Sequence, residues 1–133
     1  MNNALPTDSD APKTDDQTSV TELKQVVGTF VAERDWHRFH TPKNLAMSLA
    51  IETAELMEHF QWLTPEESLR VMDDPESRVA VGEEVADCLA YLLAIASKLD
   101  IDLATTLKAK MIRNAEKYPV EGNKFSRDNQ SGS

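Results

Sequence analysis

Apolar residues recur at intervals of three and four along much of the chain, which is the spacing of one face of an α-helix. The clearest stripe predicts a helix from about Val20 to Arg34, with Thr18 or Ser19 as its N-cap. The stripe consists of Leu23, Val26, Val27, Phe30 and Val31.

Three later segments start with a capping side chain followed by proline, the usual signal for a helix N-terminus. These are Thr41-Pro42, Thr64-Pro65 and Asp74-Pro75. The expected helices are Pro42 to Phe60, Thr64 to Met72, Asp73 to Lys98 or Leu99, and a last one from Asp100 or Asp102 to Lys117. Strand-like alternation is nearly absent, so the sequence predicts an all-α fold, a bundle of four to five helices.

The two ends differ from this pattern because they are polar and rich in small residues. We expect disordered tails at residues 1–17 and 120–133, and one folded domain at residues 18–119. Within that domain, the segment from Val85 to Ala96 has a single charged residue, Asp87, and is apolar all round. Such a helix is buried on every side, which is hard to achieve in a small monomer. This favours a homo-oligomer.

Bulk composition narrows the function. The chain has 133 residues, of which 41% are hydrophobic and 28% charged, and a formal net charge of −9. This acidity argues against general binding to nucleic acid or to anionic membranes. The polar N-terminal segment does not look like a signal peptide, and no apolar run is long enough to span a bilayer. The single cysteine, Cys88, suits a reducing compartment, so we expect a cytoplasmic protein.

Two acidic pairs at helical spacing are the strongest chemical signal. Glu52 and Glu55 lie in one apolar segment, and Glu84 and Asp87 lie in another. Residues three apart share a helix face, so each pair presents both carboxylates on the same side. Carboxylates gathered between apolar helices repel one another and lose hydration unless a cation compensates. Oxygen ligands of this kind suit Mg²⁺, with Mn²⁺ possible.

At these residues the chain resembles the all-α nucleoside triphosphate pyrophosphohydrolases of the MazG type, and more narrowly their dCTP pyrophosphatase branch. The family signature is E-x-x-E followed by E-x-x-D. The further matching segments are Phe30-Val-Ala-Glu-Arg-Asp-Trp, Phe39-His40, Pro42-Lys-Asn-Leu, Phe60-Gln-Trp, Tyr91-Leu, Lys110-Met-x-x-Asn114 and Lys117-Tyr-Pro. Some members carry a substrate-contacting histidine on the first helix, where this chain has Val27.

The resemblance implies that Glu52, Glu55, Glu84 and Asp87 bind Mg²⁺, and that a nucleoside triphosphate is cleaved between its α- and β-phosphates. Glu55 is the candidate general base. The resemblance also implies a homotetramer, with a dimer as the alternative. The expected substrate is dCTP or a modified cytosine nucleotide, and the expected role is sanitation of the nucleotide pool.

Further side chains are candidates for substrate binding. Lys110, Asn114 and Tyr118 share one face of the last predicted helix and offer an ammonium, an amide and a phenol to a triphosphate. Aromatic residues stack on nucleobases, which makes Trp36 and Trp62 candidates for the base pocket. His40 and Tyr91 complete the set, whereas His37 is interpreted as a surface residue.

Other functions fit less well. A ferritin-like di-iron bundle needs Glu-x-x-His on two helices, and no histidine lies three residues after any of the four acids. A non-catalytic helical interaction module stays open, as does a MazG-like enzyme with a different base preference. The sequence leaves open the preferred base, the identity of the general base, and whether neighbouring subunits share one site.

Overall fold

The computed structural model describes residues 11–120, and this part of the chain is entirely helical and irregular, without strands. The all-α prediction is therefore confirmed for the described residues. The α-helices are α1 (Val20–Glu33), α2 (Pro42–Glu58), α3 (Pro65–Ser68), α4 (Pro75–Lys98) and α5 (Leu103–Lys117). Two 3-10 turns, η2 (His37–Phe39) and η3 (Val71–Asp73), lie between them.

Each α-helix begins at a side-chain cap. The capping oxygens, which accept a hydrogen bond from a backbone N–H of the first turn, belong to Ser19, Thr41, Thr64, Asp74 and Asp102. These bonds satisfy amide groups that have no partner inside the helix. The predicted starts are confirmed, and the caps are Ser19 rather than Thr18 and Asp102 rather than Asp100.

The third helix is shorter than predicted. We expected it to reach Met72, but α3 ends at Ser68 and is followed by η3. The Ser68 hydroxyl donates a hydrogen bond of 2.6 Å to the carbonyl of Pro65, within the same turn. Serine bonds of this kind compete with the backbone ladder, and Leu69 beyond it is 86% exposed, so little packing supports a longer helix.

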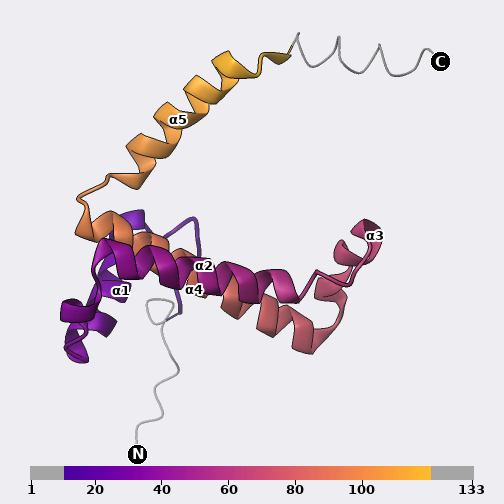
Figure 1. The fold of residues 1–133 in the computed structure, drawn as a ribbon, viewed down its shortest axis with the longest axis horizontal. Helices are drawn as coiled ribbons and strands as arrows, with labels where there is room; N and C mark the ends of the chain where they lie inside the picture. The colour runs from indigo at the N-terminus through magenta and orange to yellow at the C-terminus, as the bar shows by residue number, and fades with distance from the viewer. Residues whose placement is uncertain (1–10, 121–133) are drawn as a thin grey trace, which may run out of the picture. The chain divides into compact units, whose positions relative to one another are not determined.

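Residues 11–99 belong to one compact unit. In it α2 and α4 lie side by side along much of their length, and α1 packs against α4 (Figure 1). The buried core of the described residues consists of Val31, Leu45, Val81, Leu93 and Ala96. The core therefore joins α4 to both α1 and α2.

The α4 helix is not covered on every side within one protomer. Val85, Leu89 and Leu92, which are spaced by four and three residues, are 51%, 43% and 46% exposed. On α2, Met47 and Ile51 are also exposed. The unit thus leaves an apolar stripe on α4 open to solvent.

Residues 100–120 belong to a second unit, and α5 is the α-helix of this described part. At its C-terminus the backbone N–H of Tyr118 donates to the carbonyl of Asn114 at 2.8 Å, and the Lys117 ammonium lies 5.3 Å from the Tyr118 ring centre. The predicted tails, residues 1–17 and 120–133, fall largely outside the described residues and stay predictions. Between residues 11 and 120 no helix combines the length and apolar character needed to cross a membrane.

Candidate metal and nucleotide site

Three of the four acids predicted to bind metal come together between α2 and α4. Carboxylate oxygens of Glu52, Glu55 and Glu84 lie within 4.8 Å of one another. The Oε2 atoms of Glu52 and Glu84 are buried and have no hydrogen-bond partner among residues 11–120. The fourth acid, Asp87, lies close enough for its charge to act on Glu52.

This crowding changes the acidity of Glu52. Burial, followed by the neighbouring Glu55 carboxylate, raises its pKa from 4.5 to about 7. The charge of Asp87 and the nearby Glu84 carboxylate act in the same direction. Without a cation, Glu52 therefore holds a proton well above the pH at which an ordinary glutamate loses it.

The cluster has the properties of a divalent-cation site. A buried carboxylate oxygen without a partner is costly, and neighbouring carboxylates add repulsion. A cation removes both costs at once, and an all-oxygen donor set suits hard ions such as Mg²⁺. The residues present therefore fit the metal that the sequence predicts.

A cavity of about 180 Å³ opens beside the cluster. Its wall includes the acids Glu52 and Asp87 and three predicted substrate-binding residues, Trp36, His40 and Tyr91. The remaining lining residues are Val27, Phe30, Val31, Ala90 and Ala94. One end of this cavity is thus acidic, and the rest is aromatic and apolar.

The aromatic wall is built by the turn between α1 and α2. Asp35 has a positive φ of 53°, which reverses the chain so that Trp36 returns toward α1. The Trp36 and Phe30 rings meet edge to face, with centres 5.7 Å apart. The Arg34 guanidinium covers Phe30 at 3.7 Å and donates a hydrogen bond to its carbonyl at 3.0 Å.

From the sequence, Phe30 was assigned to the apolar stripe of the first helix and to a matching segment, but it was not predicted as a site residue. It lines the cavity and is 47% exposed. The signal that pointed to it was present in the sequence: Phe30 and Trp36 belong to one matching segment, and the turn between them brings both rings together.

Four predicted substrate-binding residues lie outside this cavity. Trp62 follows α2 and is 87% exposed. Lys110, Asn114 and Tyr118 belong to the second unit and share a face of α5 and its C-cap. A role for them in binding stays a prediction.

Comparisons with known proteins identify the family of this chain. The model of the MazG-like family matches residues 47–131. Proteins named dCTP pyrophosphatase 1 from Bos taurus and Homo sapiens are each 38% identical over 104 residues, which is 78% of this chain. The chain spans 62% and 61% of their respective lengths, less than two thirds.

A solved structure is also similar. It is a crystal structure of a pyrophosphatase from Archaeoglobus fulgidus, 41% identical, with a TM-score of 0.69. The match covers 74% of this chain and 91% of that one. The family-model match over most of the chain and this structural likeness show that the chain belongs to the MazG-like family.

Proposed function

We propose that this protein is a nucleoside triphosphate pyrophosphatase that depends on a divalent cation. It converts a nucleoside triphosphate into the monophosphate and pyrophosphate. The observation that carries the proposal is the cluster of Glu52, Glu55 and Glu84, with two unpartnered buried oxygens, beside an aromatic cavity that Glu52 itself lines. The names of the relatives support the reaction class.

The carboxylates of Glu52, Glu55, Glu84 and Asp87 would hold Mg²⁺, with Mn²⁺ as a substitute. When bound, the cation withdraws charge from phosphoryl oxygens and orients the triphosphate. Binding of the cation also requires Glu52 to give up the proton that its raised pKa otherwise retains.

Glu55 is the general base of the proposed reaction. It is the exposed member of the cluster, so water reaches it, and its two neighbours are half-buried. A water molecule attacks the α-phosphorus, and its proton passes to the Glu55 carboxylate. The bond from the α-phosphorus to the bridging oxygen breaks, and pyrophosphate leaves.

The nucleoside would occupy the aromatic part of the cavity. Trp36 offers a ring face and Tyr91 a phenol on the same side of α4 as Asp87, one turn away. His40 lies in the wall as a polar group. The names of the mammalian relatives favour dCTP as substrate, and a modified cytosine nucleotide is the alternative that we propose.

The remaining predicted residues take part in substrate binding in this proposal. Lys110, Asn114 and Tyr118 would bind the triphosphate, and Trp62 would contribute to the base pocket. The open apolar stripe of α4 supports assembly into a homotetramer, with a dimer as the alternative. The free thiol of Cys88 is in keeping with a cytoplasmic location.

The test is pyrophosphate release by the full chain from a panel of standard and cytosine-modified triphosphates, with and without Mg²⁺. Glu55→Gln should lower turnover by at least about a hundredfold, because general-base catalysis contributes about 10²–10⁴ in rate. Its helical circular dichroism should be unchanged. Glu58→Gln is the matched control, since Glu58 ends the same helix but lies outside the carboxylate cluster.

Near-normal rates in Glu55→Gln would remove the catalytic role of that residue. A complete lack of turnover and of Mg²⁺ binding in the unmodified protein would instead favour the non-catalytic interaction module. If a purine or a uracil nucleotide is hydrolysed fastest, the pyrophosphatase activity stands and only the proposed base preference is wrong.

A further inference from the structure

A second cavity, of about 230 Å³, adjoins the carboxylate-lined one. The two share four wall residues, Val27, Val31, His40 and Ala94. The second cavity is otherwise lined by Lys24, Gly28, His37, Ser97 and Lys98. We refer to these nine lining residues as the basic annex, because its polar side chains are two lysines, two histidines and one serine.

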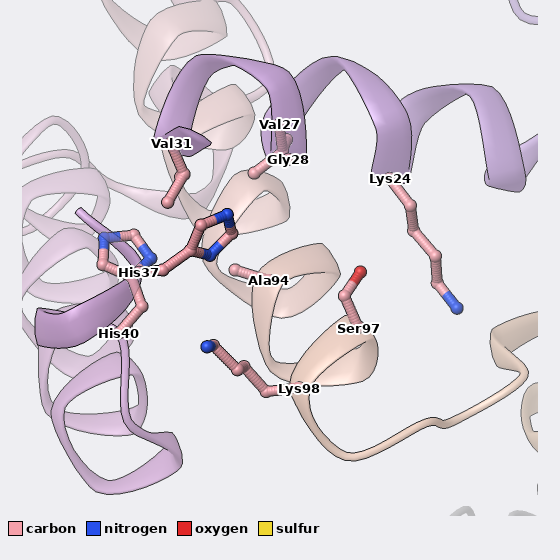
Figure 2. A pocket seen from close by; sticks show the side chains of 9 residues that line it. All are labelled: Lys24, Val27, Gly28, Val31, His37, His40, Ala94, Ser97 and Lys98. Carbon is pink, nitrogen blue, oxygen red and sulfur yellow. The ribbon is translucent and has the colours of Figure 1, made fainter. Parts of the chain in front are cut away.

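The basic side chains come from three elements and meet around the annex. Figure 2 shows the ammonium end of Lys98, on α4, on the side of the imidazole rings of His37, in η2, and His40, which follows η2. Lys24 extends from α1 on the side of Ser97. Val27 and Val31 form the apolar roof on α1. No acidic side chain is among the nine residues that line the annex.

Charge therefore reverses along one face of α4. Asp87, Tyr91, Ala94 and Lys98 follow one another at intervals of four, three and four, which keeps them on the same side of the helix. At 1.5 Å per residue, the backbone positions of Asp87 and Lys98 are about 16 Å apart. The linings of the two adjoining cavities thus change from carboxylates and aromatic rings to ammonium and imidazole groups.

The positive charges of the annex act on His40, one of the four wall residues that the two cavities share. Burial lowers the pKa of His40 below its ordinary 6.5, and the charges of His37 and Lys98 lower it further. The two lysines and His37 place basic groups around the annex, an arrangement that favours an added anion over an added cation.

We propose that the basic annex binds an oxyanion of the phosphate or carboxylate class. Where the annex lies relative to a bound nucleotide rests on the proposed function. With the triphosphate held at the carboxylate end and the nucleoside between Trp36 and Tyr91, the annex lies beyond the nucleoside. An ordinary dCTP has no negative group there.

The oxyanion has two conceivable sources, which share this chemistry. One is an acidic substituent on the nucleoside, which would make the annex a specificity element for modified nucleotides. The other is free inorganic phosphate, which would occupy the annex independently of substrate. Both sources require the ammonium of Lys98, because Lys98 is the lysine of the annex whose charge acts on His40.

The first experiment measures binding of inorganic phosphate to the full chain by isothermal titration calorimetry. The protein is first stripped of metal on a chelating resin, so that a metal at the carboxylates does not recruit the phosphate and no free chelator competes for the annex. We expect saturable binding that Lys98→Gln weakens by about tenfold, the usual effect of losing one charge-assisted bond. Lys43→Gln, at an exposed lysine that lines neither cavity, should leave it unchanged.

The second experiment compares kcat/KM for dCTP and for its 5-carboxyl analogue. Lys98→Gln should leave dCTP turnover within about twofold and should selectively lower kcat/KM for the analogue, by about tenfold. A selective loss identifies the substituent as the source, whereas phosphate binding without any selective loss identifies the free anion.

These outcomes distinguish a failure of the annex proposal from a failure of the proposed function. Absence of both phosphate binding and a Lys98-dependent preference, in a protein that hydrolyses dCTP, overturns the annex and leaves the proposed function standing. Lys98-dependent phosphate binding in a protein without turnover supports the annex and removes the proposed function.

Discussion

The hydroxyl oxygen of Thr53 on α2 lies 3.9 Å from the sulfur of Cys88 on α4. Each residue is the immediate neighbour of an acid of the site, Glu52 on one helix and Asp87 on the other. The same hydroxyl donates a hydrogen bond of 2.8 Å to the carbonyl of Leu49, which fixes its rotamer. The contact therefore marks the register at which the two acidic pairs face one another.

Because of that register, a larger side chain at position 88 should weaken both the fold and metal binding by the carboxylates. Cys88→Phe should push α2 from α4 and cost about 1–3 kcal/mol of unfolding free energy, the usual effect of overpacking. It should also weaken Mg²⁺ binding by more than about tenfold, because the carboxylates of the two helices separate. Calorimetric titration with Mg²⁺ and thermal unfolding measure the two effects.

Cys88→Ala is the control for this register effect. It removes the thiol without adding volume, so Mg²⁺ affinity should stay within about twofold while stability falls modestly, by about 1 kcal/mol. Equal metal affinity in Cys88→Phe and the unmodified protein would contradict a role for the Thr53–Cys88 contact in setting the site.

The raised pKa of Glu52 predicts an unusual pH dependence of the metal-free protein. The folded pKa of about 7 exceeds the ordinary 4.5, so the folded state binds more protons between these values than the unfolded state does. The free energy of unfolding should therefore fall as pH rises from about 4.5 to about 7. Urea unfolding in EDTA at pH 5, 6, 7 and 8 measures it.

Two additions test the origin of that slope. Glu52→Gln should flatten it, because the titrating group is gone. Mg²⁺ should stabilise the unmodified protein more at pH 8 than at pH 5, since protons compete with the cation for the same oxygens. A slope that survives in Glu52→Gln would assign the titration to another group.

Helix positions were predictable because their signals are local. Thr41, Thr64 and Asp74 each combine a capping oxygen with a proline at the next position, and all three mark real helix starts. The acidic pairs were predictable for the same reason, since the three-residue spacing already fixes a common face. The end of α3 was not predictable, because how far a helix continues depends on its packing against other elements, and a short sequence segment does not show that packing.

The cavity walls were less predictable because they join residues from different helices. Phe30 and Ala90 lie sixty positions apart in sequence and line one cavity. His37 was interpreted as a surface residue, and it is exposed, yet it also lines the basic annex. Sequence periodicity shows which face of a helix is apolar, but it does not show which neighbour that face meets.

The aromatic wall predicts a specific loss of substrate affinity. Trp36→Ala should raise KM for dCTP by about tenfold, because stacking on a base contributes about 1–3 kcal/mol. Phe39→Ala is a matched control from the same segment: Phe39 is 56% exposed and does not line the cavity. Steady-state pyrophosphate release measures both, and similar KM values for the two variants would place the nucleoside elsewhere.

The open stripe of α4 predicts an assembly that charge can disrupt. Leu89 lies between Val85 and Leu92 on this stripe, so Leu89→Glu would bury a carboxylate in any contact between copies. We expect gel filtration with light scattering to give an oligomer for the unmodified chain and a shift toward monomer for Leu89→Glu. Val26→Glu adds the same charge at a 67% exposed position of α1 and should leave the assembly intact. A monomer at micromolar concentration in the unmodified protein would show that the stripe remains exposed and that the proposed tetramer is wrong.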